Sequence, residues 1–268
     1  MRYFRRFVVN LHLPRQNNIV MKESLKIIQL RGTIFIQQNI GYTDDVAAKF
    51  KEMLLPEGKI LGVPQPGVPF NGMNPNLPQY GMSWRILKRL ENGSEYNVIF
   101  NPGKVDVVYN TDAKYGDKTE ESFCKFCAEK FGVILDELKG TKVQRIAYAP
   151  LYGIVEDQQA DLTALWNKVL KRSAFDGSPM QDVNLTYIFK KELQVGEKTI
   201  QMNLHHNLFD GFYTQQIDGQ QKVKKTFMFQ LDINSIAGVP VELDKEGVSA
   251  FFENITITKD SLVDNVIS

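Results

Sequence analysis

The stretch "SWRILKRLENGSEYNVIFNPGKVDVVYN", residues 83–110, decides the fold class. It holds three apolar-rich runs, "SWRILKRL", "EYNVIF" and "KVDVVYN", which are separated by "ENGS" and "NPG". Turn residues of this kind between short runs of β-forming residues are strong hairpin signals. The stretch therefore predicts an antiparallel meander of three strands.

Helices and one further strand surround this meander. Residues 25–38, "LKIIQLRGTIFIQQ", predict a strand with a bend at Gly32. Thr43 is a candidate helix cap, and Val46, Phe50 and Leu54 then recur on one helical face. After the meander, residues 120–138 predict a second helix. Its apolar stripe is Phe123, Cys127, Phe131, Ile134 and Leu138.

The same order of elements recurs after residue 142. A strand at 143–155 and a helix at 161–172 precede three strands, at 182–195, 198–209 and 224–236, and a closing helix begins after Asp244. Both halves therefore follow the order β-α-β-β-β-α, at 25–139 and 142–256, without residue-level identity. We predict an α+β fold of two β-α-β-β-β-α halves, with antiparallel sheets and helices packed on one face. Two such halves can join their sheets edge to edge, which hides edges that invite aggregation.

Three segments follow from this division: a basic N-terminal segment at 1–24, a first α+β lobe at 25–139 and a second at 142–268. Residues 1–26 hold six Arg or Lys and one Glu, so this region carries +5 in a chain of net charge +1. Met21 is a second candidate start of the native protein. With no run of eighteen apolar residues, no membrane span is expected. A cytoplasmic protein is the simplest interpretation.

The segment 56–82 holds six of the eleven prolines and five glycines, a density that predicts no regular element. A loop of this length is often functional, and it is either a binding lid or an ordered excursion. We predict binding residues in and beside it, namely Phe70, Met73, Tyr80 and Trp84.

The motif "HHNLFDG", residues 205–211, resembles the His-His-x-x-x-Asp-Gly signature of chloramphenicol acetyltransferases and related condensation domains. The resemblance implies His206 as general base and Asp210 as its structural anchor. It covers seven residues, and a strand follows here where the family has a helix, so we interpret it as coincidental. On a strand, His205 and His206 point to opposite faces. One is then a half-exposed sheet position and the other a hydrogen-bonded core position.

Two other patterns have structural interpretations that require no functional site. Cys124 and Cys127 have CxxC spacing, but Cys127 lies on the apolar helix stripe, where cysteine packs as a small hydrophobe. Asp232 stands inside an apolar strand and could form a carboxylate pair only with Asp210 or Asp218. No phosphate loop, Walker pattern, serine nucleophile elbow or HExxH motif occurs, so we predict no cofactor and no metal.

Across most of its length the chain resembles a sporadically distributed bacterial family of uncharacterised proteins. The features that carry this resemblance are the early strand and helix, the Pro-rich stretch, the meander, "FMFQLDIN" and "FFENITIT". Patchy distribution implies a link to mobile elements, phage conflict or toxin neutralisation.

Three functional hypotheses result. The first is a non-enzymatic binding protein, with an unknown protein partner favoured over a small molecule. The second is a small acyltransferase that uses His206. The third is a nucleic-acid-binding protein that uses the sheet and the basic N-terminus.

Overall fold

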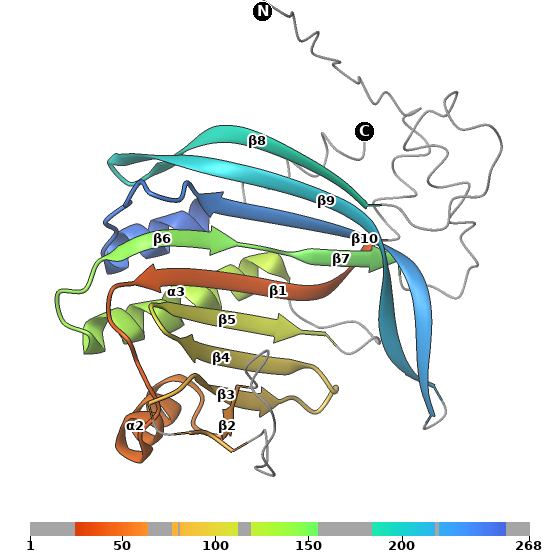
Figure 1. Ribbon diagram of the computed structural model, residues 1–268, viewed down its shortest axis with the longest axis horizontal. Helices are drawn as coiled ribbons and strands as arrows, with labels where there is room; N and C mark the ends of the chain where they lie inside the picture. The colour runs from red at the N-terminus through yellow and green to blue at the C-terminus, as the bar shows by residue number, and fades with distance from the viewer. Residues whose placement is uncertain are drawn as a thin grey trace, which may run out of the picture.

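The computed structural model describes residues 25–63, 77–79, 81–111, 119–154, 184–217 and 220–255. In these residues, antiparallel strands form one sheet in the order β2-β3-β4-β5-β1-β6-β10-β9-β8, with β7 beside β1 and β10 (Figure 1). The strands are β1 (Leu25–Ile36), β2 (Lys59–Gly62), β3 (Trp84–Arg89), β4 (Glu95–Asn101), β5 (Lys104–Asn110), β6 (Val143–Tyr148), β7 (Leu151–Ile154), β8 (Asn184–Val195), β9 (Lys198–Ile217) and β10 (Gln220–Ser235).

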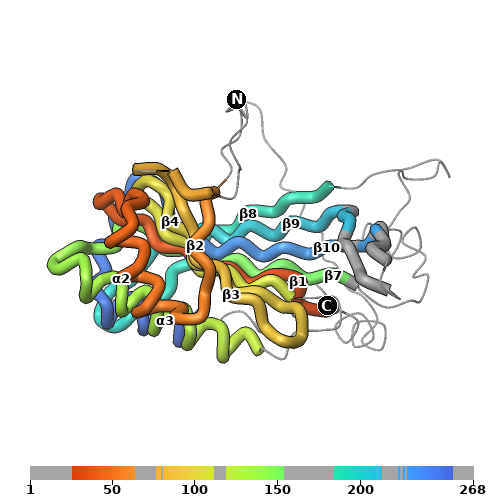
Figure 2. The backbone as a smooth tube through the Cα atoms, turned by 90° about the horizontal axis from the view of Figure 1, so that it is seen from below, coloured from red at the N-terminus to blue at the C-terminus, as the bar shows by residue number. Residues whose placement is uncertain are grey.

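Helices α2 (Asp44–Leu54), α3 (Glu120–Glu137) and a helix at 245–255 pack on one face of the sheet. In Figure 1, α3 and the helix at 245–255 lie behind the strands, and α2 lies next to β2 at the edge of the sheet. Figure 2 shows α3 along one side of the strands. The predicted α+β class, with antiparallel strands and helices on one face, is confirmed.

The two halves have matching strand orders. Inside the edge strand β2, the first half runs β3-β4-β5-β1 toward the centre, and the second half runs β8-β9-β10-β6. The halves meet where β1 pairs with β6, with Ile34 opposite Ile146. The predicted edge-to-edge junction is therefore present. The helix predicted at 161–172 lies outside the described residues.

The predicted meander is present with tight turns. Gly93 and Gly103, at φ of 85° and 67°, occupy the left-handed conformation that only glycine adopts at little cost. Helix α2 begins after Thr43, whose hydroxyl accepts a hydrogen bond from the backbone N–H of Val46 at 3.2 Å. Helix α3 begins in the same way after Thr119.

Gly32 does not bend β1. The pairing of β1 with β5 is regular through this residue, and the register shifts fall near the two ends of β1. A Cβ atom at Gly32 would lie 2.7 Å from Cys127 Sγ and 3.1 Å from the Phe252 ring. Glycine is needed here because α3 and the helix at 245–255 both pack closely on the centre of the sheet.

Strand boundaries differ from prediction in several places, and one of them is the start of β10, which lies four residues before the predicted start at Lys224. Strand β2 lies inside the Pro-rich segment and pairs with β3, so the prediction of no regular element at 56–82 was wrong for 59–62. The run at 143–155 divides into β6 and β7 at Pro150, because proline has no N–H for the ladder. Strand β9 continues eight residues past its predicted end at Phe209.

The core lies between the sheet and the helices and draws on both halves. Phe131 of α3 stacks on Phe252 of the helix at 245–255, with ring centroids 5.7 Å apart. Trp84 stacks on Phe100 at 4.2 Å, and Phe50 of α2 covers Phe100 at 5.2 Å. None of the described helices is both long enough and apolar enough to cross a lipid bilayer.

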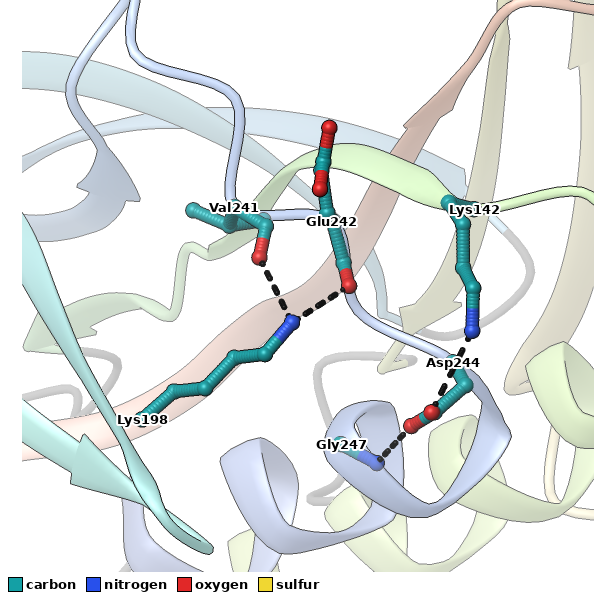
Figure 3. Close-up of polar contacts among 6 residues, drawn as sticks. All are labelled: Lys142, Lys198, Val241, Glu242, Asp244 and Gly247. Carbon is teal, nitrogen blue, oxygen red and sulfur yellow. Dashed lines mark hydrogen bonds and ion pairs between the residues drawn. The ribbon is translucent and has the colours of Figure 1, made fainter.

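Polar contacts fasten the segment between β10 and the helix at 245–255 (Figure 3). Asp244 caps this helix by accepting a hydrogen bond from the N–H of Gly247 at 3.0 Å, as predicted, and lies 3.3 Å from Lys142 Nζ. Lys198 donates to the carbonyl of Glu242 at 2.7 Å. Because Glu242 has a φ of 49°, which is costly for a non-glycine residue, this contact holds a strained turn in place.

Candidate functional site

The sheet face opposite the helices carries mostly polar side chains. Along β1, Leu30, Ile34 and Ile36 are buried toward the helices, so Arg31, Thr33 and Phe35 lie on the other face. No helix or strand of the described residues packs on that other face. We call it the polar face.

Four arginines of the described residues lie on the polar face, and one of them, Arg89 of β3, is paired with Glu95 at 2.8 Å. The other three lie one in each of three strands. The register places Arg85 on β3, Arg31 on β1 and Arg145 on β6 on this side. The Nε atom of each is buried and has no hydrogen-bond partner, and none of the three has a carboxylate partner in the parts of the chain that the structure describes. The Arg145 guanidinium lies over the Phe35 ring, 4.7 Å from its centroid. A buried donor without a partner costs about 1–3 kcal/mol, and such a group calls for an explanation.

Asp106 of β5 is the buried acid among these arginines, and other groups already satisfy it. It accepts a hydrogen bond from the Thr33 hydroxyl at 2.6 Å and pairs with Lys104 at 3.0 Å. Asn101 Nδ2 donates to its second oxygen at 3.5 Å. The charge of Asp106 is therefore matched by Lys104, and the three arginines supply positive charge beyond it.

Amide side chains fill much of the remaining polar face. Asn97 of β4 is 3% exposed, and its Oδ1 has no partner among the described residues. Gln29 Nε2 donates to Asn110 Oδ1 at 2.8 Å, and in the second half Asn207 Nδ2 donates to Gln230 Oε1 at 3.4 Å. The face therefore offers both donors and acceptors around its arginines.

The two histidines of "HHNLFDG" point to opposite faces. His205 lies opposite Asp232 on the polar face, and neither is deeply buried. His206 is 2% exposed on the helix side, in edge-on contact with Phe189 and Phe229 at centroid distances of 5.2 and 6.1 Å. The two rings are therefore splayed, as the strand pattern predicts.

His206 differs from prediction in its hydrogen bonding. Neither ring nitrogen has a partner among the described residues, although we expected a hydrogen-bonded core position. Burial lowers the pKa of His206 to about 4, because the charged imidazolium would lose its hydration. The ring is therefore neutral at pH 7. Asp210, the implied anchor, lies four residues further along β9 with its backbone opposite Phe227.

Of the predicted binding residues, Trp84 is described and lies in the core. Its ring is 0% exposed, and its Nε1 donates to the carbonyl of Ile40 at 2.8 Å. Tyr42, just before α2, contacts the Trp84 ring edge-on at 6.2 Å between ring centroids, so a ligand would reach Trp84 only if this packing opened. Phe70, Met73 and Tyr80 lie outside the described residues.

Cys124 and Cys127 are both buried in α3. Burial raises the pKa of the Cys127 thiol, so it is a poor nucleophile and a poor metal ligand. Among the described residues, no group of three or more His, Cys, Asp or Glu is arranged to hold a metal ion. Asp232 has no second carboxylate directly opposite it, because its cross-strand neighbour on β9 is His205.

A buried polar cluster joins the start of α3 to β6 and β7. The hydroxyls of Tyr148 and Tyr152 each donate to the Glu120 carboxylate at 2.7 Å. Burial and the nearby Glu120 charge raise the pKa of Tyr148, so its phenol keeps its proton. Both oxygens of Glu120 are hydrogen-bonded, which indicates a structural anchor.

An open hollow of about 510 Å³ lies where the β3–β4 turn meets α3. Lys88, Tyr96 and Phe126 are among its lining residues. Lys88 is already paired with Glu57 at 2.7 Å, so it supplies little free charge to a ligand.

The grouping of arginines on the polar face was not predicted from the sequence. A signal was present, because each stands inside a predicted strand beside at least one large apolar residue, in "QLRGT", "SWRIL" and "VQRIA". That these three share one face depends on the order of strands in the sheet, which the local pattern does not contain.

Comparison of the chain with protein-family models, curated proteins and solved structures gives no match. The resemblance to a sporadically distributed bacterial family therefore stays a prediction, and function is argued from geometry.

Proposed function

We propose that this chain is a nucleic-acid-binding protein that contacts its partner through the polar face. The observation that carries the proposal is the set of half-buried arginines, Arg31, Arg85 and Arg145, whose Nε atoms have no hydrogen-bond partner. Guanidinium groups bind phosphate oxygens with paired N–H donors, and a phosphate would contact the N–H groups that reach the surface.

The spacing of the arginines favours an extended polyanion over a small anion. Three inter-strand spacings separate β3 from β1 in the sheet, and β6 lies one spacing further. At about 4.8 Å a step, the arginine backbones lie roughly 14 to 19 Å apart across the sheet. One strand of DNA carries a phosphate about every 3.4 Å, so this span corresponds to roughly four to six phosphates.

The amides of the polar face suit the same partner. Asn and Gln side chains pair with base edges, whereas arginines position the backbone. A net charge of +1 argues against a surface that is basic all over, so binding would be confined to this face. The acyltransferase hypothesis has less support, because the His206 ring lies on the opposite, helix-covered face.

Fluorescence polarisation with labelled 20-nucleotide single strands and 20-base-pair duplexes tests the proposal. The test variant is Arg31→Gln, Arg85→Gln and Arg145→Gln together. The matched control is Lys49→Gln, Lys125→Gln and Lys245→Gln, which removes three charges from ion pairs on the helix side.

We expect the affinity of wild type for nucleic acid to fall as the salt concentration rises. The test variant should bind at least roughly 10-fold more weakly, and the slope of log affinity against log salt concentration should become shallower by up to about 3. The control should bind like wild type. If the test variant and wild type bind equally, the polar face is not the binding surface. If nucleic acids do not bind but poly-glutamate does, the partner is instead an acidic protein.

A further inference from the structure

Strands β9 and β10 continue beyond the sheet as a two-stranded ribbon. Pairing of β8 with β9 ends at Asn184 opposite Phe209, and pairing of β7 with β10 ends at Gly153 opposite Met228. Beyond these points β9 and β10 pair only with each other, from Asp210–Phe227 to Ile217–Gln220. Figure 1 shows this part bending away from the sheet. We call residues 210–217 and 220–227 the arm.

The arm is fixed to the sheet at its base. A Cβ atom at Gly211 would lie 2.4 Å from Met228 Sδ, so the missing side chain lets Met228 fold over the ribbon. Gly211 and Thr226, which are opposite each other, are both buried. This packing orients the arm, whereas a lone two-stranded hairpin is marginally stable in water.

Two large apolar side chains are exposed on the arm. Phe212 is 68% exposed and Val223 is 67% exposed. Phe212 pairs with Lys225, and Val223 stands two residues before Lys225 on β10, so alternation puts Phe212 and Val223 on the same side of the ribbon. Water-facing apolar groups on a projecting ribbon indicate a contact surface.

Four glutamines and three lysines are the most numerous polar residues of the arm. The register pairs Gln215 with Lys222 and Gln216 with Gln221, and Gln220 lies opposite Ile217. Residues 210–227 contain Lys222, Lys224 and Lys225 against Asp210 and Asp218, so the segment carries +1.

We propose that the arm reads the major groove of duplex DNA. This inference rests on the proposed function and names its partner class. The major groove is about 12 Å wide and admits a two-stranded β-ribbon. Its base edges bind the residue types found here, since glutamine pairs with adenine, lysine with guanine and phenylalanine with the thymine methyl group. The deep, narrow major groove of duplex RNA does not admit such a ribbon.

The test measures binding of the full chain to duplex DNA, duplex RNA of the same sequence, and DNA with 7-deazapurines, which lack the major-groove N7 acceptor. Selection from a random duplex library supplies the preferred sequence. The arm variant is Gln215→Ala, Gln216→Ala, Gln220→Ala and Gln221→Ala together. A second variant, Phe212→Ser with Val223→Ser, removes the apolar contacts.

We expect wild type to prefer its selected duplex over random DNA by roughly 10- to 100-fold, and over duplex RNA by a similar factor. The glutamine variant should lose most of this preference and keep its salt-dependent binding to random DNA. The apolar variant should lose part of it, and 7-deazapurines should weaken wild-type binding.

Two outcomes would overturn the inference separately from the proposed function. The arm does not read the groove if wild type binds duplex RNA and DNA equally, or if both arm variants keep the full preference for the selected duplex. In either case, loss of binding in the arginine variant would still support the polar face as a binding surface. Absence of all nucleic-acid binding would end both proposals.

Discussion

His205 and His206 differ in their surroundings because β9 alternates its side chains between the two faces of the sheet. His205 shares the polar face with Asp232, and His206 is enclosed by aromatic rings on the helix side. For His206, the enclosure removes both hydration and hydrogen-bond partners. The enclosure of His206 should therefore affect the stability of the folded protein.

Lowering the pH should destabilise the protein through His206. Its pKa is lowered from 6.5 to about 4 in the folded state, so between these values the unfolded chain binds a proton that the native chain does not. The contribution of the neutral ring is complete above pH 6.5 and is lost as the pH falls toward 4, by up to about 3 kcal/mol.

Urea unfolding at pH 7, 5.5 and 4 checks this prediction against His206→Leu. The variant should lose less stability on acidification than wild type. At pH 7 it should be about 1 kcal/mol more stable, because two buried atoms without partners are removed. Parallel pH profiles for the two proteins would show that His206 does not titrate in this range.

At the residue scale, caps and turn residues were predictable and the polar face was not. Thr43, Thr119 and Asp244 act within their own helical turns, so their roles follow from neighbours in sequence. The grouping of Arg31 with Arg145 depends on strands more than a hundred residues apart that pair at the centre of the sheet.

Among the elements, β1 illustrates the close packing of helices on the sheet. Gly32→Ala should destabilise the protein by about 1–3 kcal/mol, because the new methyl group would meet Cys127 Sγ and the Phe252 ring. Cys127→Ala should relieve part of this cost by removing one of the two contacts.

Gly132→Ala is the matched control within α3. There a Cβ atom would meet the flexible Lys245 side chain at 3.1 Å, and alanine favours the helix by up to about 1 kcal/mol over glycine. Thermal unfolding should show a clear fall in Tm for Gly32→Ala and little change or a rise for Gly132→Ala. A similar fall for both variants would contradict the packing argument.

The elements that could be predicted have local signals, namely turn pairs and helical stripes. Strand β2 was missed because it is a four-residue edge strand within a Pro-rich segment and gains its order by pairing with β3. The extension of β9 was missed because "FYTQQI" has no run of alternating apolar residues, and its strand conformation comes from pairing with β10.

On the scale of the whole molecule, the sheet continues from one half into the other through β1 and β6. Buried residues of both halves, such as Phe131 and Phe252, touch across a shared core. We therefore expect residues 25–139 and 142–255 to unfold together in a single transition.

Hydrogen exchange in increasing urea checks this cooperativity. Amides in β4 and β5 and amides in β10 should reach the same unfolding free energy at the limit of global opening. The arm should exchange faster than the sheet, because its strands pair only with each other. Loss of protection in one half at lower urea would show two independent units.

The central position of β1 also affects the order in which the chain can fold during synthesis. β1 is the first described strand to be made, yet its partners β5 and β6 end about 75 and 110 residues later. At 5–20 residues per second, a ribosome needs roughly 5 to 20 s to complete both neighbours. Throughout that interval β1, which is rich in isoleucine, lacks at least one of its partner strands. The nascent chain should therefore bind efficiently to ribosome-associated chaperones.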